Sequence, residues 1–338
     1  MTDRWTYMDG EWKPEAAAHI HIYDSHFMFG DAVFEMHRTF RHQHFLLDEH
    51  FDRLWASMRH ACIEPDFTRE HLRSLCDEAI ERNPFPADEE YRFMINVSRG
   101  PLPIYHEVFD IDRRGVNLIV NVWPLSKSTR TLAHFYDEPA DARVVSQRQV
   151  PSQYIDARVK NRSRMHYKLA DIEASAHGRK AIPLLLDDCG FVCESTGANF
   201  IMVEGDTIVI PEQRNLLRGL SMQFLLKLAR FHDIDVIERN FHIYDVGCAD
   251  EAFFTGTFYN MIPCGMLNGR RFGTTDVDHN CMGPVTRQLA SAWNEYINRN
   301  VIRFTTRDPR SDNGVQFDFV KQIRDWSDDQ IVDDLHKV

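Results

Sequence analysis

Residues 190–201 read GFVCESTGANFI, and they place one carboxylate, Glu194, among small side chains between two apolar stretches. The apolar stretches predict strands, and Glu194 ends the first of them. Because the residues that follow it are small, a flat ring could approach the carboxylate closely. A carboxylate that faces a pyridine nitrogen keeps that nitrogen protonated and makes the ring an electron sink. A lone glutamate at a strand end is more often a surface acid, so other parts of the chain have to distinguish the two interpretations.

A lysine lies upstream of this stretch, in the sequence ARVKNRSR at residues 157–164. Lys160 comes just before a segment, 163–177, whose pattern and following glycine predict a helix. Most lysines are solvated surface amines, and Lys160 taken alone would be interpreted in the same way. Its order relative to Glu194 and to two later turns singles it out, whereas Lys168 and Lys227 are expected within helices.

Two later segments have the composition of a phosphate site. The sequence LRGLSM at 217–222 precedes a predicted helix, so Gly219, Leu220 and Ser221 offer backbone N–H groups and a hydroxyl at a helix N-terminus. The sequence TGT at 255–257 follows an apolar strand and adds the hydroxyl of Thr257. Taken alone, each segment is more often an ordinary helix cap or turn.

Length and periodicity together predict two domains. The chain has 338 residues, which is enough for two domains that each bury a core. The expected units are a first domain at 1–124, a linker without clear period at 125–141, a second domain at 142–305 and a polar extension at 306–338. We expect an α/β (α+β) fold with a small N-terminal α/β domain, a larger β-rich C-terminal domain with flanking helices, and a ligand cleft between them.

Local signals predict the elements of the first domain. Residues 5–12 are predicted to form a hairpin around an Asp-Gly turn, and VFEMHRTF at 33–40 has the alternation of a half-buried strand. Asp48 and Thr68 are candidate N-caps of two amphipathic helices. Arg53 lies on the first of these helices, where its charge could pair with a phosphate brought close by the second domain.

The composition argues against several classes of function. The net charge of −12 does not suit a nucleic-acid binder, whose affinity comes mainly from Lys and Arg. No run of about 18 apolar residues and no apolar signal core is present, so we expect no association with a membrane. Seven cysteines without a CxxC motif favour reduced thiols and a cytoplasmic location. For the cluster of His19, His21 and His26 we prefer packing or a dimer contact, and we expect no metal site.

Taken in order, these blocks resemble the fold-type IV (class IV) family of pyridoxal-phosphate enzymes, over residues 5–298. The family includes branched-chain and D-amino-acid aminotransferases, R-selective amine transaminases and aminodeoxychorismate lyase. The matching blocks are GDAVFE at 30–35 with Arg38, EHFDRLWAS at 49–57, Lys160 with LA at 169–170 and EA at 173–174, Gly190 with Val192, Glu194 and NFI at 199–201, LRGLSM at 217–222, ADEAFFTGT at 249–257 with Ile262 and Pro263, and GPVT at 283–286.

The resemblance implies a role for each candidate residue. Lys160 would form the internal aldimine with pyridoxal 5′-phosphate and move the proton during transfer. Glu194 would pair with the pyridine nitrogen. The remaining cofactor-binding residues would be Arg53, Asn199, Gly219, Leu220, Ser221 and Thr257, most of them around the phosphate.

Two departures from the family pattern matter. The usual Gly-Ile-Thr-Arg is Gly-Leu-Ser-Met here, so Ser221 keeps a hydroxyl while Met222 replaces an arginine. Branched-chain enzymes often place a tyrosine five residues after the lysine, near the ring hydroxyl. That position is Met165 here, with Tyr167 close by, which weakens assignment to the branched-chain subgroup but not to the family.

The substrate side of the site is less specific. An amino-acid carboxylate needs a cationic partner, and the candidates are Arg38, Arg92 and Arg99. Each of them could equally form a structural salt bridge. Phe29 and Phe34 could wall the pocket, although aromatic residues at such positions are more often core.

We therefore expect a ping-pong transamination between an amino acid, branched-chain-like or D-, and a 2-oxo acid, catalysed by at least a homodimer. One alternative is a lyase on the same cofactor that eliminates pyruvate and needs no second oxo acid. Another is an R-selective amine transaminase, which accepts amines without a carboxylate. A third is a cofactor-free scaffold, against which the joint presence of lysine, glutamate and phosphate-turn hydroxyls argues.

Overall fold

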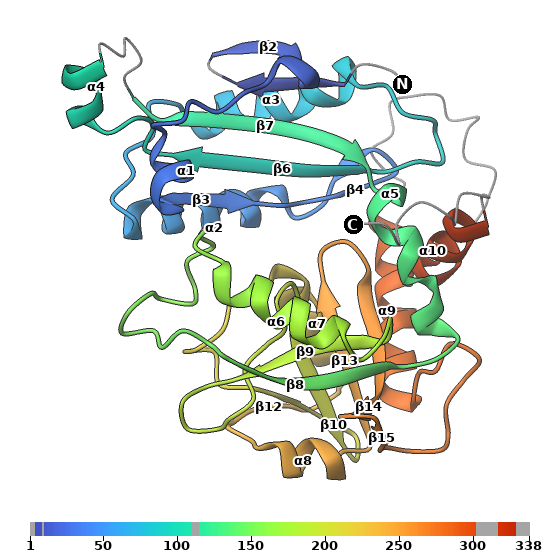
Figure 1. The fold of residues 1–338 in the computed structure, drawn as a ribbon. Coiled ribbons are helices and arrows are strands. Elements are labelled where there is room, and N and C mark those ends of the chain that lie inside the picture. Colours follow the sequence, from blue (N-terminus) through green and yellow to red (C-terminus); the bar gives the residue numbers. More distant parts are fainter. Residues whose placement is uncertain (1–3, 9, 110–114, 302–316, 329–338) are drawn as a thin grey trace.

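The computed structural model describes residues 4–8, 10–109, 115–301 and 317–328 (Figure 1). They form one large sheet in each half of the chain, each with its own helices. In Figure 1 the N-terminal half lies above the C-terminal half, and the chain passes between them at one side. The predicted two-domain α/β fold is confirmed.

The N-terminal sheet has five strands, and each neighbouring pair is antiparallel. In spatial order they are β2 (Glu11–Pro14), β1 (Trp5–Met8), β7 (Asn117–Pro124), β6 (Tyr91–Ser98) and β3 (Ala32–Glu35). Helices α2 (Leu47–His60) and α3 (Arg69–Arg82) cover the sheet and share its core with alternate residues of β6. The short helices α1 (Ser25–Phe29) and α4 (Pro103–Phe109) lie at one end (Figure 1). The predicted hairpin is confirmed as the β1–β2 pair, with Asp9 of its turn outside the described residues.

The single strand predicted over 33–40 is wrong. Strand β3 ends at Glu35, and Thr39–Phe40 forms a separate strand, β4, which pairs with β5 (Gln43–His44). Every position of 33–40 except Met36 is buried. The prediction assumed a strand with one buried face and one exposed face. This segment is instead buried on both sides, and a chain that leaves a sheet can be buried in the same way.

Of the two predicted N-caps, Thr68 is confirmed and Asp48 is wrong. The Thr68 hydroxyl accepts a hydrogen bond from the backbone N–H of His71 at 3.1 Å. Helix α2 begins at Leu47, two residues earlier than a cap at Asp48 requires, and its N-cap is Leu46, whose φ is 53°. The Asp48 carboxylate pairs with Arg73 instead. A neighbouring helix thus takes the side chain that local sequence assigned to capping.

The C-terminal sheet has eight strands. Its order is β12 (Val236–Glu238), β11 (Thr207–Ile210), β10 (Asn199–Glu204), β13 (Glu251–Gly256), β14 (Asn260–Leu267), β8 (Ala140–Arg148) and β9 (Ala181–Leu186), with β15 (Arg270–Arg271) paired to β14. The associated helices are α6 (Met165–Ser175), α7 (Leu220–Phe231), α8 (Ile243–Cys248) and α9 (Pro284–Asn300). Alternate residues of β10 supply two separate cores: Ile201 and Val203 pack with α7 and α9, and Phe200 and Met202 pack on the other face.

The segment around Glu194 is irregular rather than the strand predicted. Residues 187–198 contact their neighbours through isolated bridges, Leu186 with Val192 and Glu194 with Asn199. The chain turns directly after Glu194, where the Ser195 N–H donates to the Ala198 carbonyl, and Glu194 itself is 4% exposed.

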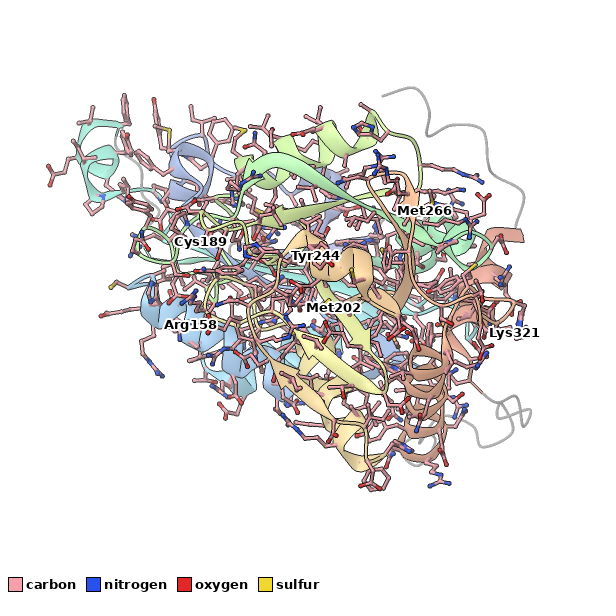
Figure 2. The ribbon with its side chains drawn as sticks, turned by 90° about the horizontal axis from the view of Figure 1, so that it is seen from below. Arg158, Cys189, Met202, Tyr244, Met266 and Lys321 are labelled. Carbon is pink, nitrogen blue, oxygen red and sulfur yellow. The ribbon has the colours of Figure 1, made fainter. Side chains whose placement is uncertain are left out.

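The segment predicted as a linker is helical. Between the two sheets lie α5 (Ser126–Thr129) and the 3-10 helix η2 (Arg130–Tyr136). In the predicted C-terminal extension, the described residues contain helix α10 (Phe319–Asp328), which packs on η2 and α5. Figure 2 views the molecule from below and has Lys321 of α10 at the rim, whereas Met202 lies near the centre. Among the described residues, no helix has the length and apolar character needed to cross a membrane.

Candidate active site

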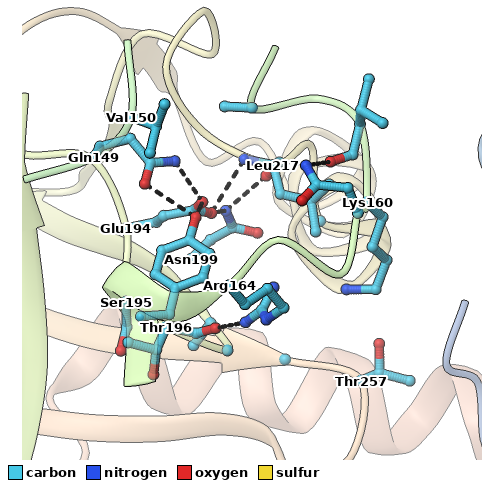
Figure 3. Close-up of a pocket in the computed structure, with 18 of the residues that line it drawn as sticks. Gln149, Val150, Lys160, Arg164, Glu194, Ser195, Thr196, Asn199, Leu217 and Thr257 are labelled. Atoms are coloured by element: carbon cyan, nitrogen blue, oxygen red, sulfur yellow. Dashed lines mark hydrogen bonds between the residues drawn. The ribbon is translucent and has the colours of Figure 1, made fainter. Parts of the chain in front are cut away.

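One pocket brings together the residues predicted to bind a cofactor (Figure 3). Its volume is about 840 Å³, measured with its open mouth. The C-terminal half supplies four segments of its lining, and Arg53 of α2 joins them from the N-terminal half. The predicted residues that line it are Arg53, Lys160, Glu194, Asn199, Gly219, Leu220, Ser221 and Thr257.

Lys160 lies in the loop that links β8 to α6, and its backbone is bound to the N-terminal half. Its N–H donates to Ser57 Oγ (3.3 Å), and its carbonyl accepts from the N–H of Phe34 (2.9 Å). The Lys160 amine is 4.6 Å from the centre of the Phe34 ring. Burial, followed by the charge of Arg53, lowers the pKa of the amine to about 7. A large share of this amine is therefore neutral near pH 7, which nucleophilic attack on a carbonyl requires.

The Glu194 carboxylate accepts hydrogen bonds from four neutral groups. Its Oε1 accepts from the Tyr167 hydroxyl (2.8 Å) and the Gln149 amide (3.1 Å). Its Oε2 accepts from the Asn199 amide (3.2 Å) and the backbone N–H of Leu217 (3.1 Å). Burial outweighs these hydrogen bonds and raises the pKa of Glu194 to about 7. A carboxyl group with this proton affinity can share a proton with a basic ring nitrogen.

Asn199 joins this carboxylate to the start of α7. Its amide donates both to Glu194 and to the carbonyl of Leu217, the latter at 2.8 Å. A Cβ on Gly219 would lie 1.9 Å from Asn199 Oδ1, so no residue larger than glycine fits without displacing the amide. The glycine that the sequence offered as part of a phosphate turn is thus also needed for this contact.

The N-terminus of α7 contributes Leu220 and Ser221 to the pocket lining. Its N-cap residue, Gly219, has no side chain that could accept from the first backbone N–H groups. Backbone N–H groups and the helix dipole at such an end favour an anion. Thr257 adds a hydroxyl from the turn after β13. These groups form a cradle suited to a phosphate.

Arg53 is held beside this cradle by a buried carboxylate. Its Nε and one terminal nitrogen donate to the two oxygens of Glu35, at 2.6 and 2.8 Å, and the other terminal nitrogen donates to the Arg218 carbonyl at 3.1 Å. His50 Nδ1 lies 2.7 Å from Glu35 Oε2. Although burial alone would raise the pKa of Glu35, the charge of Arg53 and then the His50 hydrogen bond hold it well below its usual value. The two-point pairing fixes the plane of the guanidinium.

The two aromatic residues predicted to wall the pocket have different surroundings. Phe34 is 3% exposed and lies beside the Lys160 amine, with the Arg162 guanidinium 3.8 Å from its ring centre. Phe29, the last residue of α1, is 60% exposed and does not line the pocket. Of the pair, Phe34 alone contacts a residue of the site, the Lys160 amine, although it is not part of the pocket lining.

The three arginines predicted to bind a substrate carboxylate do not line the pocket. Arg99 forms a two-point ion pair with Asp31, at 2.9 and 3.2 Å. Arg38 is 1% exposed and donates to backbone carbonyls and to Gln322. Its burial excludes direct contact with a substrate in this conformation. The residues around these guanidinium groups, which are distant in sequence, determine where each one lies.

Arg92 is enclosed by aromatic rings. Its guanidinium carbon lies 3.7 Å from the centre of the Phe258 ring and 5.0 Å from that of Trp123. Burial lowers its pKa to about 10. Phe258 directly follows the lining residue Thr257, so Arg92 contacts the neighbour of a lining residue and not the pocket itself.

Gln149 and Arg164 are two of the lining residues that were not identified from the sequence. Gln149 donates to Glu194, as described above, and Arg164 donates to the carbonyl of Thr196 and lies over the Tyr167 ring at 4.4 Å. Arg164 occurs in ARVKNRSR, four positions after Lys160, but a run of arginines is equally typical of a solvated loop. No signal in the sequence marked Gln149.

Tyr167, the tyrosine near the departure noted after Lys160, contacts the Glu194 carboxylate. Met165 is 75% exposed and does not line the pocket, while the Tyr167 hydroxyl donates to Glu194 and lies 3.0 Å from Gln149 Oε1. The Tyr167 hydroxyl is therefore used to hold the Glu194 carboxylate.

The chain matches the family model for amino-transferase class IV over residues 32–265, well over half its length. It is 28% identical over 288 residues to a putative branched-chain-amino-acid aminotransferase of Methanocaldococcus jannaschii, a match that covers 84% of this chain and 93% of that protein. It is 24% identical over 290 residues to a D-alanine aminotransferase of Listeria monocytogenes, with 83% and 92% covered.

Solved structures share the fold. A branched-chain aminotransferase from Thermoproteus uzoniensis, solved with norvaline, has a TM-score of 0.75 at 22% identity and covers 87% of this chain and 94% of its own. The PLP form of a branched-chain amino acid aminotransferase from Thermobaculum terrenum has a TM-score of 0.72 at 21% identity, with 87% and 94% covered. The fold-type IV prediction is confirmed, and the chain belongs to the class IV aminotransferase family.

Proposed function

We propose that this protein is a pyridoxal-phosphate-dependent transaminase that moves an amino group between an amino acid, branched-chain-like or D-, and a 2-oxo acid. The observation that carries the proposal is the single pocket that holds the Lys160 amine, the buried Glu194 carboxylate and the N-terminus of α7. Donor and acceptor differ mainly in an amino or oxo group. We therefore expect them to use this pocket in turn, in a ping-pong order.

The residues present fit the cofactor that class IV aminotransferases use. Lys160 would hold it covalently, Glu194 would face its ring nitrogen, and Asn199 would keep that carboxylate in place. Its phosphate would be bound by Arg53, Gly219, Leu220, Ser221 and Thr257. When bound, pyridoxal phosphate supplies an electron sink for the negative charge that develops at the substrate Cα.

The pKa of Lys160 suits a group that has to both accept and donate a proton. With a pKa of about 7, its Nζ can both take and release a proton at neutral pH at little free-energy cost. We expect Nζ to take the proton that leaves the substrate Cα and to hold it until the product forms. The Phe34 ring covers one side of the amine.

For the substrate carboxylate, Arg164 is our first candidate and Arg92 the second. Arg164 lines the same pocket as Lys160, and in the described part of the chain its guanidinium donates one hydrogen bond, to Thr196. Arg164→Gln should raise KM for the amino acid by about tenfold or more while kcat changes less, since a charge-assisted bond contributes about 1.5–3 kcal/mol. Lys168→Gln, on an exposed position of α6, serves as control. A change confined to kcat would exclude this role for Arg164.

We also propose a homodimer. Exposed apolar side chains occur on α1, on α4, in the loop before Lys160 and on α6: Phe27, Phe29, Ile104, Val108, Phe109, Tyr154, Ile155, Met165, Leu169 and Ile172. Extensive apolar surface of this kind is typical of an interface between protein chains. Light scattering coupled to size exclusion tests it, and a monomer at micromolar concentration would contradict it. The cytoplasmic location stays a prediction from the cysteine pattern.

The deciding experiment is a visible spectrum of the wild type and of Lys160→Ala with pyridoxal phosphate, before and after a panel of L- and D-amino acids. We expect an aldehyde-derived band in the wild type that an amino acid converts to the amine form, and no lysine-linked band in the variant. The amino acid that responds would name the subgroup. A band unchanged in Lys160→Ala would contradict the assignment of the lysine. A wild-type band that no amino acid converts would favour the lyase or the amine transaminase.

A further inference from the structure

Arg38 joins three parts of the chain that are far apart in sequence. One terminal nitrogen donates to the carbonyl of Phe258 (3.1 Å), the other to Gln322 Oε1 (3.0 Å), and Nε donates to the carbonyl of Thr39 (3.0 Å). The guanidinium carbon lies 3.9 Å from the centre of the Phe40 ring. Because the guanidinium is planar and all three nitrogens have acceptors, its position fixes those acceptors relative to one another.

The turn that Arg38 contacts also contains a pocket residue. Residues 257–259 connect β13 to β14, and Thr257, which lines the pocket, directly precedes Phe258. The Phe258 ring lies against Arg92, as described above. On the other side, Tyr259 packs so closely on Gly256 that a Cβ there would lie 2.8 Å from its ring. The position of Thr257 therefore depends on contacts made outside the pocket.

Gln322 belongs to helix α10, which has its own contacts with the C-terminal half. Phe319 and Ile323 are buried in the core formed with α7 and α9. Arg324 donates to Asp137 (2.6 Å) and to the carbonyl of Tyr136 (3.1 Å). Figure 1 shows α10 beside α5, where the two halves of the molecule meet. The helix can thus remain bound if the Gln322 contact is lost, which makes the contact separately testable.

We propose that Arg38 and Gln322 are positioning residues that hold the turn carrying Thr257, so that helix α10 contributes to cofactor retention in a pocket that it does not line. The inference rests on the proposed function, since it requires Thr257 to bind the cofactor phosphate. Loss of the Gln322 acceptor leaves a buried guanidinium N–H unpaired, and the guanidinium then moves or turns to find another partner. The Phe258 carbonyl would follow it, and the Thr257 hydroxyl and N–H would leave the phosphate position.

The test is the affinity of the full-length apoprotein for pyridoxal phosphate and, separately, for pyridoxal, which lacks the phosphate. Gln322→Ala should weaken binding of pyridoxal phosphate by about tenfold, the size of one charge-assisted hydrogen bond, and should leave the affinity for pyridoxal unchanged. Gln322→Glu keeps an acceptor for Arg38 and should restore wild-type affinity.

Arg324→Gln is the matched control, because it removes contacts of the same helix without touching Arg38. It should lower the melting temperature of the apoprotein and leave both affinities unchanged. Equal losses in Gln322→Ala and Arg324→Gln, an equal loss of pyridoxal affinity, or no loss in a folded Gln322→Ala would overturn the inference alone. A wild type that binds no pyridoxal phosphate would overturn the proposed function, and this inference with it.

Discussion

Glu35 and Glu194 are both buried carboxylates beside the same pocket, yet their proton affinities have moved in opposite directions. Glu35 meets the Arg53 guanidinium at two points, and its pKa lies well below the usual value. Glu194 meets only neutral donors, and burial raises its pKa to about 7. An ionised carboxylate beside a cation is suited to hold that cation in place, whereas a carboxyl group with a pKa near 7 is suited to share a proton. The comparison thus separates an anchor from a group that can take part in proton chemistry.

The largest expected effect comes from replacing Glu194. Glu194→Gln should lower kcat by about 10³-fold, because a neutral amide cannot keep a ring nitrogen protonated, and general acid–base groups contribute about 10²–10⁴-fold. Steady-state kinetics with a responding amino acid measure the change. Glu204→Gln, an exposed glutamate at the end of β10, is the control. Activity within tenfold of wild type would show that Glu194 has no such role.

Replacing Glu35 should mainly lower the free energy of unfolding. Glu35→Gln leaves the Arg53 guanidinium and His50 without their charged partner, and breaking a buried pair costs about 3–5 kcal/mol. Urea unfolding of the apoprotein measures the loss of unfolding free energy. The control is Asp52→Asn, since Asp52 is next to Arg53 on α2 and pairs with Arg69 at the surface. Equal free energies of unfolding for both variants would contradict the role of Glu35 as anchor.

The two carboxylates should also give opposite pH dependences of stability. The folded state binds the Glu194 proton more tightly than the unfolded state, so its contribution is most favourable below pH 4.5 and falls as pH rises toward 7, by up to about 3 kcal/mol. The contribution of Glu35 is present above pH 4.5 and is lost as pH falls below it. Free energies of unfolding of wild type, Glu194→Gln and Glu35→Gln at several pH values check this. Differences from wild type that change in the same direction with pH would be inconsistent with it.

The smallest effect concerns one neutral donor. Tyr167→Phe removes the hydroxyl that donates to Glu194 Oε1, and loss of this bond should raise the pKa of Glu194 further, by about one unit or less. Carbon-detected NMR of the labelled carboxyl follows the titration. Tyr154→Phe, at an exposed position in the loop before Lys160, is the control. A lowered pKa in Tyr167→Phe would mean that the hydroxyl destabilises the charged carboxylate.

The order of blocks along the chain was enough to predict the fold and most of the segments that line the pocket. Lys160, Glu194 and the glycine before α7 each depend on local features: a loop before a helix, a turn after an apolar stretch, and a helix N-terminus. Such features recur at fixed places in chains with this fold, so their order carries information. Asn199 and Thr257 were found in the same way.

Tertiary packing alone determined the interaction partners of the charged side chains. Arg38 bonds to residues 220 and 284 positions away, and Arg99 pairs with Asp31, 68 positions away. Asp48 looked like a cap but contacts Arg73, and Arg164, which was not identified from the sequence, lines the pocket. A flexible guanidinium or carboxylate takes the strongest partner within reach, and which partners are within reach is known only once distant segments have packed. The sequence by itself therefore determined the fold and the segments that line the pocket, while the structure decided which charged side chains line it and which form contacts outside it.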